Sequence, residues 1–168
     1  TFDRVFDQGS TQAGVFGDVG AGMTQACLEG FNTTIFAYGQ TGAGKTYTVV
    51  GPDDGNKTAE GLIPRVLRDL FRTIAELRAQ EGSAGTTSYK CRASICEIYQ
   101  EQVRDLTSSA NKSGEVSHLQ VRESLSRGVY VDGLTMHPIA TAEDAIELLR
   151  SGLEHRQVAA TNMNEASS

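Results

Sequence analysis

Eight consecutive residues form the pattern best suited to chemistry in this chain of 168 residues. They match the phosphate-binding pattern G-x-x-x-x-G-K-[ST] and are Gly39, Gln40, Thr41, Gly42, Ala43, Gly44, Lys45 and Thr46. The three glycines allow the backbone to curl so that successive N–H groups point at phosphate oxygens. In this pattern the Lys45 ammonium reaches the β and γ phosphates, and the Thr46 hydroxyl takes a Mg²⁺ coordination position. The alternative is a glycine-rich turn that matches by chance.

The residues on either side favour the nucleotide interpretation. Residues 33–38 are a short β-branched and aromatic run, which predicts a buried strand leading into the loop. Residues 45–50 can open a helix directly after it. This order places the loop at the positive end of a helix, where anions bind. We therefore expect a nucleoside triphosphate site.

Four segments resemble, in the same order, the motifs of one protein family. Residues 27–48, which contain the phosphate loop, are similar to the signature of kinesin motor domains. Residues 2–7 resemble the F-x-V-F strand of that family, and residues 97–106 resemble its E-I-Y-N-E-x-[IV]-x-D-L segment. Residues 161–168 resemble the opening of its switch I, N-x-x-S-S-R-S-H. On these matches the chain is identified as a member of the kinesin motor family.

The resemblance implies an α/β fold: the three-layer P-loop NTPase fold of the kinesin motor type, with a central mixed sheet that is incomplete here. We expect residues 1–168 to form one partial motor domain, from the strand before the first motor helix to the start of switch I. Within it lie the phosphate loop at 39–46, a loop insertion at 51–61 and the switch I start at 161–168. Switch II and the R-x-R-P strand of the family have no counterpart, so we expect about the N-terminal half of a motor head.

The resemblance also assigns roles to single residues, with ATP and Mg²⁺ as the implied ligands. Thr46 would ligate the metal, and Tyr47 falls where kinesins place a ring against the adenine. Packing of the helix explains the Tyr47 ring equally well. Asn164, Ser167 and Ser168 match the switch I residues that act on the γ-phosphate, and Ser168 would be a second Mg²⁺ ligand. Without the preceding motifs, these three residues would be a helix end or a polar tail.

The implied activity is ATP hydrolysis coupled to movement along microtubules by the full-length protein, in the cytoplasm and on the microtubule cytoskeleton. Arg122 and Arg127 flank a turn at which kinesins touch β-tubulin, and a solvated arginine pair is the alternative. We expect the 168-residue piece alone to be inactive, because switch II and the neck linker are missing. Two other functions stay open: another P-loop NTPase, and a motor-like domain that binds microtubules without ATP turnover.

Composition agrees with a soluble α/β domain and argues against nucleic-acid and membrane partners. The chain is 39% hydrophobic and 21% charged, close to the globular average. A net charge of −6 gives no electrostatic case for nucleic-acid binding. No apolar run approaches the ~20 residues of a membrane span, so no membrane partner is expected. The three cysteines and three histidines lack metal-ligand spacing, and we expect reduced thiols and ordinary histidines.

Apolar periodicity and capping signals predict three helices. Residues 12–28 form the first, with Ser10 or Thr11 as its N-cap and Gly30 after its end. Its expected inner face is Val15, Phe16, Val19, Met23, Ala26 and Cys27. Next comes a surface loop at 51–61, a solvated connector, and then a second helix whose apolar stripe is Ile63, Val66, Leu67, Leu70, Phe71, Ile74 and Leu77. The third starts at a capping box from Thr141, with Ala145, Ile146, Leu149 and Leu153 inward.

The strand signals lie mainly in the second half of the chain. Residues 89–99 alternate strongly enough to predict one long strand, and residues 119–134 predict a strand, turn and strand with Arg127 and Gly128 in the turn. Residues 107–117 are polar and predict a mobile loop. Glu97, Glu101 and Asp105 could suggest paired carboxylates, but the segment fits a strand end and we expect no catalysis there.

Overall fold

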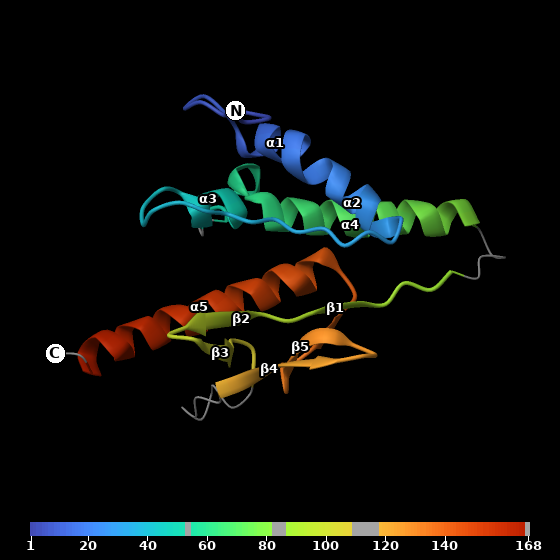
Figure 1. Cartoon of the computed structure of the whole chain (residues 1–168). Coiled ribbons are helices and arrows are strands. Elements are labelled where there is room, and N and C mark those ends of the chain that lie inside the picture. The colour runs from blue at the N-terminus through green and yellow to red at the C-terminus, as the bar shows by residue number, and fades with distance from the viewer. Residues whose placement is uncertain (53–54, 82–86, 109–117, 167–168) are drawn as a thin grey trace. The chain divides into compact units, whose positions relative to one another are not determined.

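The computed structural model describes residues 1–52, 55–81, 87–108 and 118–166, and the side chains of residues 157–166 lie outside this description. The chain divides into two compact units, Thr1–Thr87 and Ser88–Ser168. Within the described residues, all assigned helices of the first unit precede all assigned strands, which belong to the second unit (Figure 1).

The first unit opens with a helical run that confirms the predicted helix at residues 12–28. Thr11 is its N-cap, and its side-chain oxygen accepts a hydrogen bond from the Gly14 N–H at 3.1 Å. Gly30, with φ of 95°, follows its end in the left-handed region that glycine adopts readily. The run has three parts: α1 (Gln12–Val15), the π-helix η1 (Phe16–Gly20) and α2 (Ala21–Leu28).

The π-helix changes which side chains of this run are buried. At its end the Ala21 N–H donates to the carbonyl of Phe16, five residues back rather than four. This extra residue rotates the downstream face, so Gly20 and Thr24 are buried while Cys27 is exposed. The predicted inner face was therefore wrong for Cys27, and also for Val19, which is 42% exposed.

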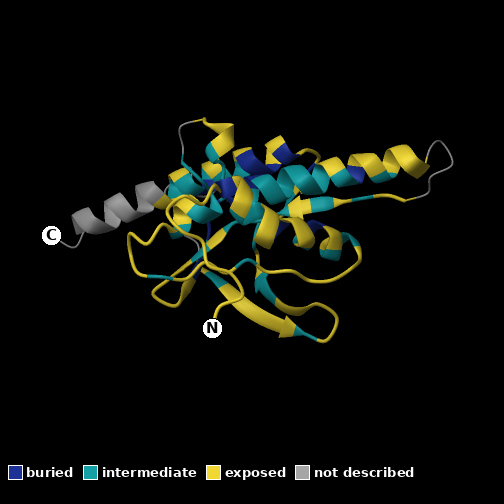
Figure 2. Cartoon of the chain, turned by 90° about the horizontal axis from the view of Figure 1, so that it is seen from above, coloured by how far each residue is buried: buried dark blue, intermediate teal, exposed yellow. Residues whose placement is uncertain are grey.

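Two further helices confirm the predicted order of elements. The last two residues of the phosphate loop open the five-residue helix α3 (Lys45–Val49), and a turn of 3₁₀ helix, η2 (Lys57–Ala59), lies in the insertion. The long helix α4 (Leu62–Glu81) carries the predicted apolar stripe, of which Ile74 is buried and the other members half-buried (Figure 2). Both η1 and α2 pack against α4.

The two strands predicted in this unit are absent from its described residues. Residues 2–7 and 33–38 have no strand assignment, and Phe36 and Tyr38 are 84% and 90% exposed. The rings of Phe36 and Tyr38 stack with centroids 6.5 Å apart, as side chains two positions apart do on an extended chain. The local propensity for extension was therefore correct, but a strand also needs a hydrogen-bonded neighbour, and the described residues supply none.

The described residues of the second unit form two antiparallel sheets. In one, β1 (Cys91–Ala93) pairs with β6 (His137–Ile139). In the other, the strands follow the order β2-β3-β4-β5. Their bounds are β2 (Cys96–Tyr99), β3 (Gln102–Asp105), β4 (His118–Ser124) and β5 (Gly128–Asp132).

The single long strand predicted at residues 89–99 was wrong. It is interrupted at Ser94 and Ile95, and its two parts belong to different sheets. The Ile95 carbonyl accepts a hydrogen bond from the Leu106 N–H at 3.0 Å, which satisfies the backbone at the break. Alternation in the sequence shows that both parts are extended, but it does not show that they have different partners.

Two hairpins complete this sheet. The first turns at Gln100 and Glu101, whose φ values of 48° and 63° are the pair that a type I′ turn requires. The second confirms the predicted strand, turn and strand, and Gly128 follows its turn with φ of 66°. Most of the polar loop predicted at 107–117 lies outside the described residues.

The predicted capping box is confirmed at the start of α5 (Ala142–Ala166). The Asp144 N–H donates to the Thr141 hydroxyl at 3.1 Å, and the Asp144 carboxylate accepts from the Thr141 N–H at 2.9 Å. Hydrogen bonds from the backbone of Ala140 and from Thr141 lower the pKa of the Asp144 carboxyl. The predicted inner face of α5 is buried at Ala145 and Ile146 and half-buried further along. The helices and sheets of the two units together confirm the predicted α/β class.

Candidate nucleotide site

The phosphate loop has the backbone geometry that its glycines predict. Gly42 and Gly44 have φ of 81° and 84°, in the left-handed region. The loop turns through a hydrogen bond from the Ala43 N–H to the Gln40 carbonyl at 3.2 Å. The first hydrogen bond of α3 runs from the Thr48 N–H to the Gly44 carbonyl at 2.9 Å. The three N–H groups before Thr48 in α3 therefore have no acceptor within the helix and can serve an anion.

Lys45 already lies over the loop. Its ammonium donates to the carbonyls of Gly39 and Gln40, each at 2.7 Å. These two acceptors keep the positive charge beside the backbone that would surround a phosphate. Thr46 is exposed, so its hydroxyl is open to a metal or to solvent. An ammonium, a hydroxyl and free N–H groups are the donor set that a triphosphate with Mg²⁺ requires, so these residues fit both ligands.

Tyr47 presents an exposed ring and a tethered backbone. The residue is 54% exposed, which leaves a ring face accessible to an aromatic base. Its carbonyl accepts a hydrogen bond from the Gln12 side-chain amide at 2.6 Å. Sequence reasoning missed Gln12, which lies 35 positions away, because no local pattern distinguishes it from a surface glutamine in the first turn of a helix.

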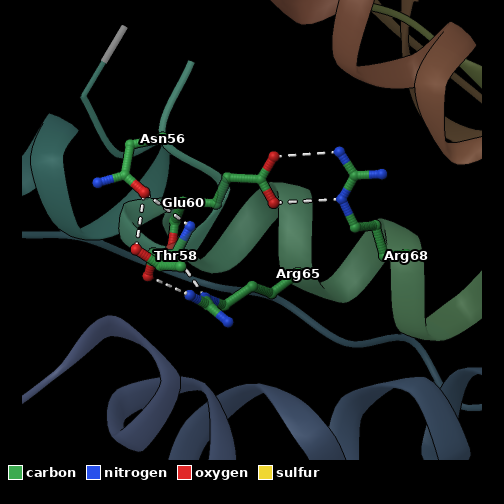
Figure 3. A network of polar contacts seen from close by, with 5 residues as sticks. All are labelled: Asn56, Thr58, Glu60, Arg65 and Arg68. Atoms are coloured by element: carbon green, nitrogen blue, oxygen red, sulfur yellow. Dashed lines mark hydrogen bonds and ion pairs between the residues drawn. The ribbon is translucent and has the colours of Figure 1, made fainter. Parts of the chain in front are cut away.

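The insertion at 51–61 is held to α4 by a polar network, shown in Figure 3. Asn56 accepts from the Thr58 N–H at 3.0 Å and from the Thr58 hydroxyl at 2.7 Å. Arg65 donates to the carbonyls of Glu60 and Thr58, both at 2.8 Å. The Arg68 guanidinium meets the Glu60 carboxylate at two points, 3.0 and 3.1 Å. The described residues of the insertion are therefore held against α4 by hydrogen bonds. The sequence predicted a solvated connector and did not predict these contacts with the helix.

The switch I residues predicted from the family lie at the end of the second unit. The backbone of α5 continues as helix through Asn164 to Ala166. Ser167 and Ser168 lie outside the described residues. The phosphate-loop residues are thus brought together in the first unit, while Asn164 has a described position in backbone only.

Both candidate microtubule-contacting arginines lie on the second hairpin. The Arg122 guanidinium forms an ion pair with Asp132 at 3.0 Å across β4 and β5. The Arg127 guanidinium lies over the Tyr130 ring, 4.5 Å from its centroid. At the tip between them Leu125 is fully exposed. The hairpin therefore presents an exposed apolar side chain at its tip and two guanidinium groups, each positioned by a side chain of β5.

Two carboxylates near β3, those of Glu97 and Asp105, are held by ion pairs and hydrogen bonds. Glu97 lies between two guanidinium groups, 3.9 Å from Arg104 and 3.8 Å from Arg156. Asp105 is 4% exposed and accepts hydrogen bonds from the backbone of Thr107 and Thr135, both at 2.8 Å. Burial alone would raise the pKa of the Asp105 carboxyl, but the hydrogen bonds from Thr135 and Thr107 outweigh it and lower the pKa.

The described residues lack two further features. They contain no group of three or more His, Cys, Asp or Glu side chains placed to hold a metal ion. No helix among them combines the length and apolar character needed to cross a bilayer.

Comparison with known proteins agrees with this geometry. The family model for the kinesin motor domain matches residues 1–168. The chain is 42% identical to Kinesin-like protein KIF15 of Strongylocentrotus purpuratus and 42% identical to Kinesin heavy chain of Gibberella moniliformis, with all of the chain covered in both. It spans 11% and 17% of the length of these two relatives.

A solved structure gives the same result for the fold. It is titled "Structure of a fast kinesin: Implications for ATPase mechanism and interactions with microtubules" and superposes with a TM-score of 0.86 at 40% identity. The match covers 98% of this chain and 43% of the solved chain. The α/β fold is that of part of a kinesin motor, and the chain belongs to the kinesin motor domain family.

Proposed function

We propose that this chain binds ATP through residues 39–46 and that the complete protein hydrolyses it to move along microtubules. The observation that carries the proposal is the state of the loop. Lys45 lies over two loop carbonyls, Thr46 is exposed, and the first N–H groups of α3 have no helical acceptor. Membership of a family of microtubule motors supports the coupling to movement.

Lys45 would bind the phosphates by exchanging partners. Its ammonium leaves the Gly39 and Gln40 carbonyls and donates to β- and γ-phosphate oxygens, which carry more negative charge than a carbonyl. The N–H groups of the loop and of the first turn of α3 hold the remaining phosphate oxygens. The Tyr47 ring would stack on the adenine. Magnesium, when bound by Thr46 and phosphate oxygens, neutralises charge that develops on those oxygens.

Hydrolysis would also need the switch I residues. We assign to Asn164, Ser167 and Ser168 the contacts with the γ-phosphate and the attacking water. Ser168 would also be the second protein ligand, after Thr46, of the same Mg²⁺ ion. What supports this assignment is their match to the family motif N-x-x-S-S. Hydroxyl and amide groups suit the task because they position water without adding charge beside the triphosphate.

Binding to microtubules is proposed for the complete protein, in the cytoplasm and on the microtubule cytoskeleton. The hairpin β4–β5 would contribute Arg122 and Arg127, and tubulin is an acidic partner for which cations are suited. Because the chain spans less than half of the solved kinesin chain, the other contacts are assigned to the rest of the protein. The net charge of −6 supports no nucleic-acid partner.

The test compares Lys45→Ala with a matched variant, Lys90→Ala, in the complete protein. Lys90 is exposed in the second unit and is not among the residues assigned to ATP or Mg²⁺. Loss of the charge-assisted contact should weaken ATP binding at least about tenfold and nearly abolish microtubule-stimulated hydrolysis. Lys90→Ala should match the wild type in both assays.

Two outcomes separate the alternatives. Equal ATP affinity in the wild type and Lys45→Ala would remove the phosphate-loop assignment. Normal ATP and microtubule binding by the wild type, without ATP turnover, would favour a motor-like domain that binds without hydrolysis.

A further inference from the structure

The helix that carries the proposed metal ligand is too short to fix its own position. Helix α3 has five residues, Lys45–Val49. A helix of this length is unstable in water, because few hydrogen bonds form for the many backbone dihedral angles that become fixed. Its orientation must therefore come from contacts with other parts of the first unit. Any group that fixes α3 also fixes Lys45 and Thr46.

At the C-terminal end of α3, the Tyr47 carbonyl lacks the backbone donor that a further helical turn would supply. In a continuing helix the Tyr47 carbonyl would accept from the N–H of Gly51. Here that N–H donates to the Thr46 carbonyl at 3.3 Å, which also accepts from the Val50 N–H at 2.8 Å. The Tyr47 carbonyl is instead satisfied by the Gln12 side-chain amide at 2.6 Å.

Gln12 is well placed to hold this carbonyl. It is the first residue of α1 and is only 8% exposed, although glutamine is mostly a surface residue. Its amide nitrogen is the atom that faces Tyr47, because a carbonyl can accept but cannot donate. If the amide were removed, the part-buried carbonyl would lose its donor, and such a loss is costly.

We infer that Gln12 is a positioning residue of the nucleotide site: its amide holds the Tyr47 carbonyl and thereby sets the orientation of α3. The inference rests on the proposed function, since it concerns how well the site binds ATP. Gln12 acts through the backbone of Tyr47 and contacts no proposed ligand group. Its removal should loosen the phosphate-binding end of the helix without altering Lys45 or Thr46 themselves.

The experiment uses Gln12→Met, which keeps the length of the side chain and removes the donor. A milder variant, Gln12→Asn, keeps the amide but withdraws it by one methylene and so guards against a folding defect. The matched control is Gln25→Met on α2, where the exposed Gln25 amide donates to the nearby Glu29 carboxylate at 2.7 Å. In the complete protein three quantities are measured: Kd for a fluorescent ATP analogue, the thermal midpoint, and hydrogen exchange over residues 45–50.

For Gln12→Met we expect the Kd to rise about tenfold, equivalent to about 1.4 kcal/mol, with a smaller rise for Gln12→Asn. Amide exchange at Thr48 and Val50 should become faster, while Gln25→Met should match the wild type. A lower thermal midpoint with unchanged Kd and exchange would overturn the inference, because it would show a role in stability alone. Wild-type protein that fails to bind ATP would overturn the proposed function together with the inference.

Discussion

Gly51 and Gly61 approach so closely that the backbone leaves no room for a side chain. A Cβ on Gly61 would lie 2.7 Å from the Gly51 nitrogen and 2.6 Å from the Val49 carbonyl carbon. The Gly61 N–H also donates to the Val50 carbonyl at 3.0 Å. This contact closes the base of the 51–61 insertion and joins the end of α3 to the start of α4.

Gly61→Ala should therefore destabilise the protein by about 1–3 kcal/mol, because the added methyl group meets backbone that cannot move aside easily. The matched control is Gly22→Ala in α2, where an added Cβ has no neighbour within 4 Å. Gly22→Ala should stabilise by up to about 1 kcal/mol through helix propensity. Denaturant titration measures both, and equal effects would contradict the close approach.

The pair Glu60 and Arg68 should show a measurable coupling. Their side chains are 15% and 32% exposed and meet at two points, so solvent screens them less than a surface pair. A double-mutant cycle with Glu60→Gln and Arg68→Met should give a coupling of about 1 kcal/mol. In the coupling energy, the contributions that each side chain makes to other groups cancel.

The control cycle uses Arg72 and Glu76, an exposed pair one helical turn apart on the same helix, which should couple by about 0.3–0.5 kcal/mol. A Glu60–Arg68 coupling no larger than this would show that the network does not hold the insertion.

Asp105 should make the free energy of unfolding fall at acidic pH. Because its folded-state pKa is lowered, it contributes stability that is fully present above the unfolded pKa of about 3.9 and is lost as pH falls through the folded pKa. Asp105→Asn should reduce stability at pH 7 and flatten the fall in stability below about pH 4. The matched control is Asp3→Asn, which removes an exposed carboxylate of the first unit. A wild-type slope retained in Asp105→Asn would place the titrating group elsewhere.

Ile74 and Leu70 on α4 should differ in their contribution to stability. Ile74 is 5% exposed, while Leu70 is half-buried. Ile74→Ala should cost about 2–5 kcal/mol, and Leu70→Ala less, since truncation costs scale with the buried contacts removed. Neither should change ATP affinity selectively. A larger loss for Leu70→Ala would mean that the face of α4 is assigned incorrectly.

Local patterns predicted the elements whose stability depends on neighbours in sequence. The phosphate loop needs glycines at fixed positions, and Gly42 and Gly44 adopt the expected left-handed conformation. The capping box at Thr141 and Asp144 forms because both partners lie within one turn. In each case the chemistry and the geometry are contained in a few consecutive residues.

Predictions that depended on distant partners were wrong or incomplete. Residues 33–38 are extended but unpaired in the described structure, and residues 89–99 divide between two sheets. Strand pairing requires a second segment, and alternation within one segment does not identify it. The one residue that η1 adds to the helical run likewise moved Cys27 out of the expected inner face.

The sequence by itself indicated the family, through motifs that resemble those of kinesin motors, and the α/β class that this resemblance implies. It also indicated the residues proposed to bind phosphate, because their types stand at the spacing of a phosphate loop. Only the tertiary structure decided which groups hold α3, the helix that carries Lys45 and Thr46. Gln12 reaches Tyr47 across 35 positions, and Glu60 meets Arg68 on the helix beyond the insertion. The physical reason is that a five-residue helix has too few internal hydrogen bonds to fix its own orientation, so its position depends on groups that folding brings from elsewhere.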